Sequence, residues 1–349
     1  MFEHVPIRLS HHNTAKFDPS LLPENIRSFY HATIKHNTFE RAISVLHENF
    51  QMGLLGGTDG IGCVIDGSPG VGKTFALETF IGEIYALEQY QPTKELIKLP
   101  ILKIRVPGRP TVNRVAEKLL YNGVHISPSS KKTDSILVKL YRMIEYQQVR
   151  MIIFDEFQHL LRKYAQVSTN DVVTFMKVLI DDLGLSVVFS GSSEGIDYLK
   201  MFPELNQRVC TERVTLIPFN IATKENKLDF IAFVKSIDKT LVELGFSIIP
   251  LSDPDMLIRL LLATRGIPRF ISRLLLKTLI RNQNKPVITK KDIGSVYQSM
   301  CINEHLGKFD PFKAELNMVE TKYLSYLRSL QKKQKETTAK PGTREGESS

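Results

Sequence analysis

The feature that most constrains this chain is an eight-residue stretch that reads Gly67-Ser68-Pro69-Gly70-Val71-Gly72-Lys73-Thr74 and matches the pattern G-x-x-x-x-G-K-[ST]. Its glycines allow the backbone to curl until successive N–H groups point inward at phosphate oxygens. Lys73 offers a positive charge to the β- and γ-phosphates of a nucleotide, and Thr74 offers a hydroxyl to Mg²⁺. The pattern therefore predicts an ATP site with magnesium as cofactor.

The segments on either side agree with a phosphate-binding loop, which must follow a strand and open a helix. Residues 61–66 form a short, mostly apolar run that suits a buried parallel strand, and a helical pattern begins at Phe75. The helix presents its positive N-terminus to the same phosphates, so Phe75 joins the predicted nucleotide-contacting residues. A glycine turn that matches by chance is the alternative, and the order strand, loop, helix argues against it.

Composition fits a globular protein of about two domains. The chain has 349 residues, of which 42% are hydrophobic and 24% are charged. No run of about eighteen apolar residues is present, so no membrane span is expected, and residues 1–6 lack a secretory signal. Cys63, Cys210 and Cys301 form no C-x-x-C pair, which favours a reducing cytoplasm over a disulfide framework or a zinc site.

Apolar runs alternate with helical patterns up to about residue 220. The expected strands cover residues 61–66, 99–106, 151–154, 185–190 and 214–217. A helix with an apolar stripe from Phe39 to Phe50 precedes them, followed by a glycine-rich link over 53–60. The alternation predicts an α/β fold, a parallel sheet sandwiched by helices. From Thr223 the pattern is almost wholly helical, which predicts a small α-helical domain.

Four regions follow from this pattern. Residues 1–36 are an N-terminal arm, 37–220 the nucleotide-binding α/β domain, 221–312 the helical domain, and 313–349 a C-terminal helix and tail. From about Leu330 the chain is rich in Lys, Glu, Thr, Gly and Ser and has almost nothing to bury, so this tail is expected to be disordered.

Two carboxylates, Asp155 and Glu156, follow the apolar strand 151–154. Ligands of open parallel sheets bind at this end of the strands. Asp155 suits Mg²⁺ binding through water, and Glu156 suits orienting and polarising the water that attacks the γ-phosphate. Two exposed acids at the start of a loop are the alternative.

Polar residues after the fourth strand extend the candidate site. Ser190 and Ser192 flank Gly191, and either hydroxyl suits contact with the γ-phosphate or the attacking water, with Ser190 preferred. Arginine stabilises the charge that develops on the γ-phosphate. Arg208 and Arg213 are candidates to act on the nucleotide of a neighbouring subunit. Short hydroxyls in turns and solvated surface arginines are the alternatives.

Together these motifs resemble an AAA+ ATPase: the phosphate-binding loop, the Asp-Glu strand, the hydroxyl-bearing strand and a helix that begins Gly266-Ile267-Pro268-Arg269. Within that superfamily the order is similar to the TniB/TnsC-type ATPases of transposons, which are relatives of MuB. The specific likenesses are Arg105-Val106-Pro107 with Pro110-Thr111, Phe154-Asp155-Glu156-Phe157-Gln158-His159-Leu160, and Asp310-Pro311-Phe312, over roughly residues 30–312. Many relatives have a threonine after glycine where this chain has Ser190 and Ser192.

The resemblance implies a bacterial, cytoplasmic, DNA-associated protein. Members assemble on double-stranded DNA as ATP-dependent rings or filaments, mark the transposition target, recruit the transposase and hydrolyse ATP to reset. A target-selector protein, in some cases CRISPR-derived, is a further implied partner. By the same resemblance Arg208 is the arginine that acts in trans, and Arg269 is the sensor of the helical lid.

The net charge of +9 is compatible with binding to a polyanion such as nucleic acid. The basic residues expected to contact DNA are Lys103, Arg105, Arg109, Arg114, Lys131 and Lys132. Contacts to phosphate need only positive charge and confer little sequence preference. A solvated basic face is the alternative. No aromatic residues are interleaved with the basic ones for stacking on single strands, so duplex DNA is preferred.

Three other functions remain open at this point. The first is a nucleotide-gated DNA scaffold that hydrolyses little ATP. The presence of Glu156 argues against it. The second is an ATPase of the replication-origin or helicase-loader type, which shares much of the pattern. The third is a P-loop kinase, which predicts a phosphoacceptor pocket and no need for an arginine in trans.

Overall fold

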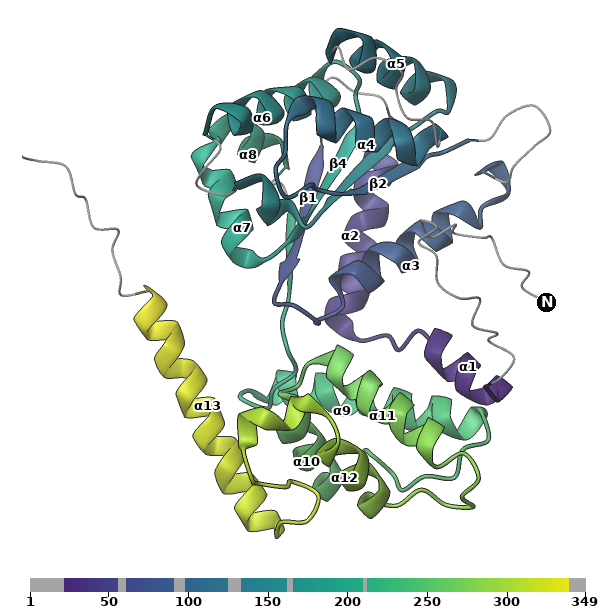
Figure 1. Cartoon of the computed structure of the whole chain (residues 1–349), viewed down its shortest axis with the longest axis vertical. Helices are drawn as coiled ribbons and strands as arrows, with labels where there is room; N and C mark the ends of the chain where they lie inside the picture. Colours follow the sequence, from purple (N-terminus) through teal and green to yellow (C-terminus); the bar gives the residue numbers. More distant parts are fainter. Residues whose placement is uncertain are drawn as a thin grey trace, which may run out of the picture. The chain divides into compact units, whose positions relative to one another are not determined.

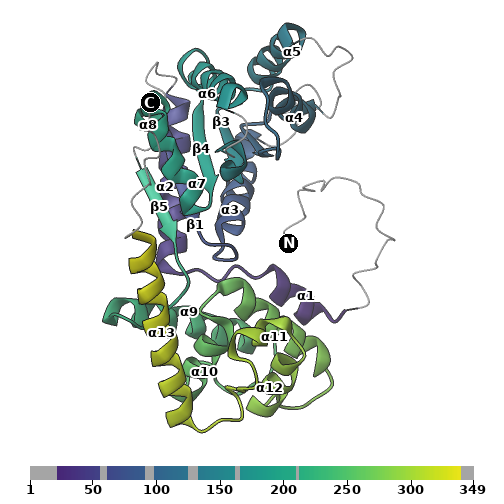
Figure 2. The same ribbon diagram turned by 60° about the vertical axis from the view of Figure 1, so that its left-hand side comes forward.

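The computed structural model describes residues 22–55, 61–90, 98–124, 133–161, 166–209 and 212–338. These residues form two compact units, shown in Figures 1 and 2. Residues 37–217 belong to the first unit, and residues 22–36 and 218–338 belong to the second. Each unit is described by itself below.

A five-stranded parallel sheet forms the centre of the first unit (Figure 1). Its strands are β1 (Gly62–Gly67), β2 (Ile101–Arg105), β3 (Met151–Asp155), β4 (Ser186–Gly191) and β5 (Glu212–Leu216). Their order across the sheet is β2-β3-β4-β1-β5, and every neighbouring pair is parallel. The α/β fold predicted from the sequence is confirmed.

Helices cover both faces of this sheet because its side chains alternate between two apolar cores. Val64, Ile152 and Val187 face the core formed with α4 (Val112–Val124), α5 (Thr133–Tyr146), α6 (Gln166–Asp181) and α8 (Pro203–Val209). Cys63, Ile153 and Val188 face the core formed with α2 (Asn37–Leu54) and α3 (Lys73–Tyr85). Short elements η2 (Glu88–Tyr90), η3 (Phe157–Leu161), α7 (Ser193–Asp197) and η4 (Tyr198–Met201) complete the described part of the unit.

Helix α2 is longer than expected, because Gly53 belongs to its last turn and not to a link. A Cβ on Gly53 would lie 2.8 Å from Cβ of Ser186 and 3.1 Å from the carbonyl oxygen of Arg150. The glycine therefore allows α2 to approach the amino ends of β3 and β4 closely. Residues 56–60 of the expected link lie outside the described residues.

Helices are the main elements of the second unit, whose described residues also include one isolated bridge between Ile248 and Ile288. Its elements are α1 (Glu24–His31), α9 (Lys224–Glu243), α10 (Pro254–Thr264), α11 (Pro268–Arg281), α12 (Lys290–Gln298), η5 (Cys301–Leu306) and α13 (Leu316–Thr338). They share one apolar core. Ile26 and Phe29 bring α1 into this core, and Val319 and Tyr323 bring α13 into it. The sequence predicts both segments to lie outside the helical domain, within residues 1–36 and 313–349.

Helix α13 also corrects the expectation for the tail, since it continues past Leu330 to Thr338. Lys, Gln and Glu, which fill this stretch, have good intrinsic helix propensity, which favours a continued helix. Residues 339–349 lie outside the described residues.

A tight connection joins α10 to α11. Arg265 and Gly266 both have left-handed backbones, with φ of 55° and 66°. A Cβ on Gly266 would lie 1.9 Å from the carbonyl oxygen of Phe219, whose N–H donates to the Gly266 carbonyl at 2.8 Å. Only glycine fits this position. Pro268 then opens α11, where its missing N–H is tolerated.

The stretch Asp310-Pro311-Phe312 has a structural role in this unit. Buried Arg259 donates to the carbonyl oxygens of Pro311 and Ala314, and its guanidinium also bonds Asp255. Phe312 packs so closely on Gly294 that a Cβ there would lie 2.9 Å from Cβ of Phe312. These contacts hold the turn that leads into α13.

Candidate nucleotide site

Three neighbouring strand ends form the candidate site, all at the carboxyl edge of the sheet. Strand β4 lies between β1 and β3. The phosphate-binding loop follows β1, Asp155 and Glu156 end β3, and Ser190 and Gly191 end β4. The strand order therefore brings together groups that are far apart in the sequence, at the edge where ligands of parallel sheets bind.

The loop from Gly67 to Gly72 has the geometry of an anion cradle. Gly67, Gly70 and Gly72 have φ values of 146°, 88° and 108°, in the range that favours glycine. A Cβ on Gly67 would lie 2.1 Å from the carbonyl oxygen of Leu216, so only glycine fits there. Helix α3 begins directly after Gly72, which gives its first turn no side-chain cap. The N-terminus of α3 therefore presents its positive end to a phosphate bound in the loop.

Lys73 is the first residue of α3, and its Nζ donates to the carbonyl oxygens of Gly67 at 2.6 Å and Ser68 at 3.0 Å. A phosphate in the loop would compete for this ammonium. Thr74 follows Lys73 on the helix, and Phe75 is 42% exposed with its ring tilted against that of Phe39 at 5.6 Å.

Asp155 is buried at the end of β3, and its Oδ1 accepts the N–H of Glu156 at 3.0 Å. Its Oδ2 lies 3.9 Å from Nζ of Lys103. A hydroxyl on Thr74 and a carboxylate on Asp155 are the hard oxygen donors that Mg²⁺ prefers, so the residues present fit that ion. The same Lys103 also donates to Glu78 at 3.4 Å.

Glu156 has a left-handed backbone with φ of 58°, which is uncommon for a residue other than glycine and typical of functional sites. Its carboxylate accepts a hydrogen bond from Nε2 of Gln158. Nη2 of Arg105 and Nε2 of His159 lie 3.9 Å and 4.0 Å from its oxygens. The sequence analysis named Gln158 and His159 within a motif but gave them no role.

Ser190 is fully buried, and its Oγ has no hydrogen-bond partner among the described residues. It pairs in register with Ile65 of β1, two residues before the phosphate-binding loop. The Oγ of Ser192 accepts the N–H of Gly195 at 3.3 Å and so supports the first turn of α7.

Asp66, the residue before the loop, is buried and forms an ion pair with the partly exposed Arg213. Arg213 donates to it from Nε at 3.0 Å and from Nη2 at 2.7 Å, and the Thr215 hydroxyl donates at 2.7 Å. Burial raises the pKa of Asp66, but hydrogen bonds from Arg213, Ser193 and Thr215 and the Arg213 charge more than offset this and hold that pKa below its ordinary value. Arg213 therefore serves its own chain.

We expect Arg213→Ala to reduce the free energy of unfolding by about 3 kcal/mol, since it leaves a fully buried carboxylate without its charge partner. Because the pKa of Asp66 is lowered, the contribution of the pair is present above its unfolded pKa and is lost as pH falls through its folded pKa. Urea denaturation at neutral and acidic pH measures both effects. Exposed Arg142 of α5 is the control, and Arg142→Ala should change stability by less than about 0.5 kcal/mol. An equal loss in the two variants would contradict this role for the pair.

Arg208 lies near the amino edge of the sheet, away from its own phosphate-binding loop. The neighbouring Val209 packs against Gly62, where β1 starts, and β1 reaches the loop about 16 Å further on. Nε of Arg208 bonds Asp181 at 2.6 Å, and Nη1 donates to the Glu204 carbonyl at 2.8 Å. The residue thus lies too far from its own loop to contact a nucleotide there.

The remaining basic residues expected to contact DNA are Arg105, Arg109, Arg114, Lys131 and Lys132. Arg105, Arg109 and Arg114 are exposed where β2 leads into α4, and Nη1 of Arg114 donates to the Arg109 carbonyl at 3.2 Å. Lys118, which the sequence analysis did not single out, donates to the Arg105 carbonyl at 2.7 Å. Lys131 and Lys132 lie outside the described residues.

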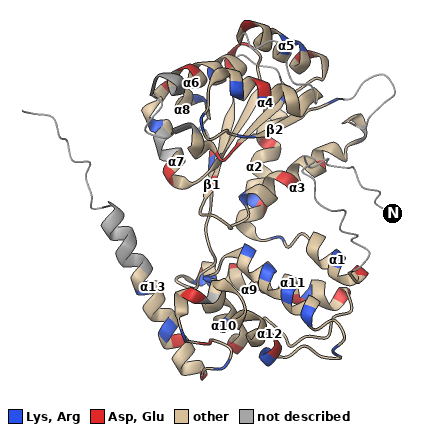
Figure 3. Ribbon diagram, in the orientation of Figure 1, with Lys and Arg blue, Asp and Glu red and all other residues tan. Residues whose placement is uncertain are grey.

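Arg269 belongs to the second unit, as the second residue of α11. Basic residues recur along this helix at every fourth position, Arg269, Arg273, Lys277 and Arg281, and the helix contains no acid (Figure 3). Like charges four residues apart on a helix repel, so this face is suited to an anionic ligand or surface. The sequence analysis named only the first member of the row.

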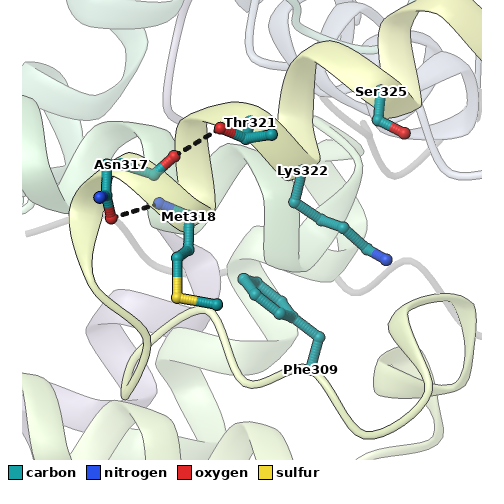
Figure 4. A pocket seen from close by; sticks show the side chains of 6 residues that line it. All are labelled: Phe309, Asn317, Met318, Thr321, Lys322 and Ser325. Atoms are coloured by element: carbon teal, nitrogen blue, oxygen red, sulfur yellow. Dashed lines mark hydrogen bonds between the residues drawn. The ribbon is translucent and has the colours of Figure 1, made fainter.

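A surface hollow of about 430 Å³ lies beside α13 in the second unit (Figure 4). Its lining residues are Phe309, Asn317, Met318, Thr321, Lys322 and Ser325. The Thr321 hydroxyl donates to the Asn317 carbonyl at 2.8 Å, and Nζ of Lys322 lies 5.8 Å from the centre of the Phe309 ring. The lining includes no acid and no glycine loop, so the hollow lacks the groups of a nucleotide site.

Solved structures with a similar fold include several ORC proteins. The Aeropyrum pernix ORC1 protein in complex with DNA has 17% sequence identity and a TM-score of 0.52, with 80% of this chain and 68% of that chain covered. The ADP form of the Aeropyrum pernix ORC2 protein has 14% identity and a TM-score of 0.56, with 86% and 83% covered. Drosophila ORC bound to DNA has 14% identity and a TM-score of 0.50, with 82% and 68% covered. No curated protein matches the sequence.

The parallel sheet, its phosphate-binding loop and the helical second unit define an AAA+ fold. A family model described as bacterial TniB protein matches residues 31–217, which is more than half of the chain. The chain therefore belongs to the bacterial TniB protein family, and the family prediction is confirmed. Among the described residues, no helix is both long and apolar enough to span a membrane.

Proposed function

We propose that this chain is an ATP hydrolase that assembles on duplex DNA, marks a transposition target site and recruits a transposase. The observation that carries the proposal is the meeting of three strand ends, which brings the phosphate-binding loop, Asp155 with Glu156, and Ser190 to one edge of the sheet. Binding of DNA and of ADP by proteins of the same fold gives further support.

Each residue then has a defined task in hydrolysis. The N–H groups of the loop and Lys73 bind the phosphates, and Thr74 and Asp155 hold Mg²⁺, which neutralises charge that develops on the phosphate oxygens. Glu156 accepts a proton from the attacking water as the water oxygen bonds to the γ-phosphorus. The bond from the γ-phosphorus to the β,γ-bridging oxygen breaks at the same time, so ADP leaves and phosphate is formed. Ser190 is proposed to donate toward the γ-phosphate, which is supported by the absence of a partner for its Oγ among the described residues.

Arginines complete the proposal. Arg208 lies near the amino edge of its own sheet, away from its own phosphate-binding loop. It is therefore proposed to act on the nucleotide of a neighbouring copy, which makes assembly part of the mechanism of hydrolysis. Arg269 is proposed to contact the nucleotide from the second unit. The residues proposed to contact DNA phosphates are Lys103, Arg105, Arg109, Arg114, Lys131 and Lys132. Transposase and target-selector partners follow from the transposon resemblance.

Electron microscopy of the protein with duplex DNA tests the assembly. We expect rings or filaments only when DNA and a nonhydrolysable ATP analogue are both present, because the nucleotide completes the contact between neighbouring copies. Samples that lack DNA, and samples with ADP in place of the analogue, are the controls. A monomer under all conditions that transfers phosphate to a small molecule would favour a P-loop kinase instead.

A further inference from the structure

Gln158 connects the two polar strand ends that the proposed reaction uses. Its Nε2 donates to Oε2 of Glu156, and its Oε1 accepts the N–H of Ser192 at 3.1 Å. Ser192 follows the end of β4 and begins the turn into α7. One side chain thus bridges the carboxylate expected to activate water and the segment expected to contact the γ-phosphate.

The chemistry of the two partners fixes the orientation of this amide. An ionised carboxylate only accepts hydrogen bonds, and a backbone N–H only donates. The group between them must therefore donate at one end and accept at the other, which an amide does. A carboxylate at position 158 would face Glu156 with a like charge, and an aliphatic side chain would satisfy neither partner.

Two glycines form the slot that holds Gln158. A Cβ on Gly191 would lie 2.4 Å from Oε1 of Gln158, and a Cβ on Gly195 would lie 2.5 Å and 2.8 Å from its Cβ and Cα. Neither glycine has a left-handed backbone, so the close approach of Gln158 accounts for the absence of a side chain at both. The slot is therefore shaped to this residue.

The neighbourhood also holds Glu156 where Gln158 can reach it. Phe157 is fully buried against Phe189, with ring centroids 4.2 Å apart, so the chain on either side is fixed to the core. The left-handed backbone of Glu156 then turns the chain so that Gln158, two residues later, faces its carboxylate.

We infer that Gln158 is a positioning residue: it orients the Glu156 carboxylate for attack on the γ-phosphate and couples it to the β4 end. This inference rests on the proposed function. It predicts that loss of the bridge slows hydrolysis and leaves nucleotide binding intact, since Gln158 contacts neither the phosphate-binding loop nor Lys73 in the hydrogen bonds described.

The test compares steady-state ATP hydrolysis and binding of a nonhydrolysable ATP analogue in the full-length protein with saturating duplex DNA. We expect Gln158→Leu to lower kcat by about 10- to 100-fold, the effect of misplacing a catalytic group, with analogue affinity within about twofold of wild type. The control is Gln147→Leu, because buried Gln147 donates to the Gly123 carbonyl at 3.2 Å, outside the site. It should leave kcat unchanged even where it lowers stability.

A double-mutant cycle separates positioning from a general effect on folding. Gly191→Ala should displace the Gln158 amide and lower kcat as Gln158→Ala does. In the double variant Gly191→Ala should cause little further loss of kcat, because the Gln158 amide with which its Cβ would clash is absent. Additive losses, an unchanged kcat in Gln158→Leu, or a parallel fall in analogue affinity would each overturn the inference. Wild-type protein that binds ATP without hydrolysing it would overturn the proposed hydrolase as well.

Discussion

Lys73→Ala is expected to reduce ATP hydrolysis by about 100- to 1,000-fold, the effect of removing one preorganised donor from a developing anion, and to weaken ATP binding in parallel. Its Nζ already lies within the loop, bonded to the carbonyl oxygens of Gly67 and Ser68. Alanine leaves the loop without its only side-chain cation. The phosphate charge of bound ATP and the charge that develops in the transition state therefore both lose a positively charged partner. Titration with a fluorescent ATP analogue and a phosphate-release assay measure the two losses.

The control for this variant is Lys139→Ala on α5, since Lys139 is exposed and belongs to another layer of the same unit. It should bind and hydrolyse ATP like wild type. Both variants should unfold at similar denaturant concentrations. Undiminished affinity of Lys73→Ala for ATP with magnesium would mean that the nucleotide site has been misplaced.

The elements that the sequence predicted well are those set by local rules. The strand before the phosphate-binding loop, the helix after it and the carboxylates at the end of β3 follow from apolar runs and short motifs. The boundaries differ by a few residues, as at Gly53, because a glycine that allows close helix packing resembles a glycine in a link. Local pattern does not distinguish the two.

Contacts between distant segments could not be predicted in this way. The pair of Asp66 with Arg213 joins residues 147 positions apart, and the Gln158 bridge to Ser192 joins residues 34 positions apart. Both depend on the strand order, which the pattern of apolar runs does not specify. Gln158 had a detectable signal, its place two residues after Glu156, but its partner across the sheet edge is visible only in three dimensions.

The short helix α1 shows a third reason for a missed element. Its eight residues include Ile26 and Phe29, three positions apart, and both are buried in the second unit. Such a short helix has little stability of its own and forms because packing stabilises it. Contact with the core of the second unit stabilises α1. The local sequence pattern does not contain this contact, so it predicts an N-terminal arm without a helix.

Glu156→Gln is expected to lower the rate of ATP hydrolysis by about 100- to 10,000-fold, the usual contribution of a general base. An amide has nearly the shape of the carboxylate, and its oxygen still accepts the hydrogen bond from Gln158, so the local geometry is kept. It does not accept a proton from the attacking water at neutral pH. ATP affinity should therefore remain within about twofold of wild type, in contrast to Lys73→Ala.

The same variant separates a hydrolase that resets its assembly from a scaffold that only responds to nucleotide binding. If hydrolysis is the reset, Glu156→Gln should form the same assemblies on duplex DNA with ATP as wild type does with a nonhydrolysable analogue, and these should persist when wild-type assemblies disperse. Light scattering after addition of ATP follows both. Glu145→Gln, at an exposed position of α5, is the matched control and should behave like wild type. Equal lifetimes of the Glu156→Gln and wild-type assemblies would mean that hydrolysis does not control disassembly, because only the wild-type protein has the proton acceptor. Nucleotide binding alone would then be the switch.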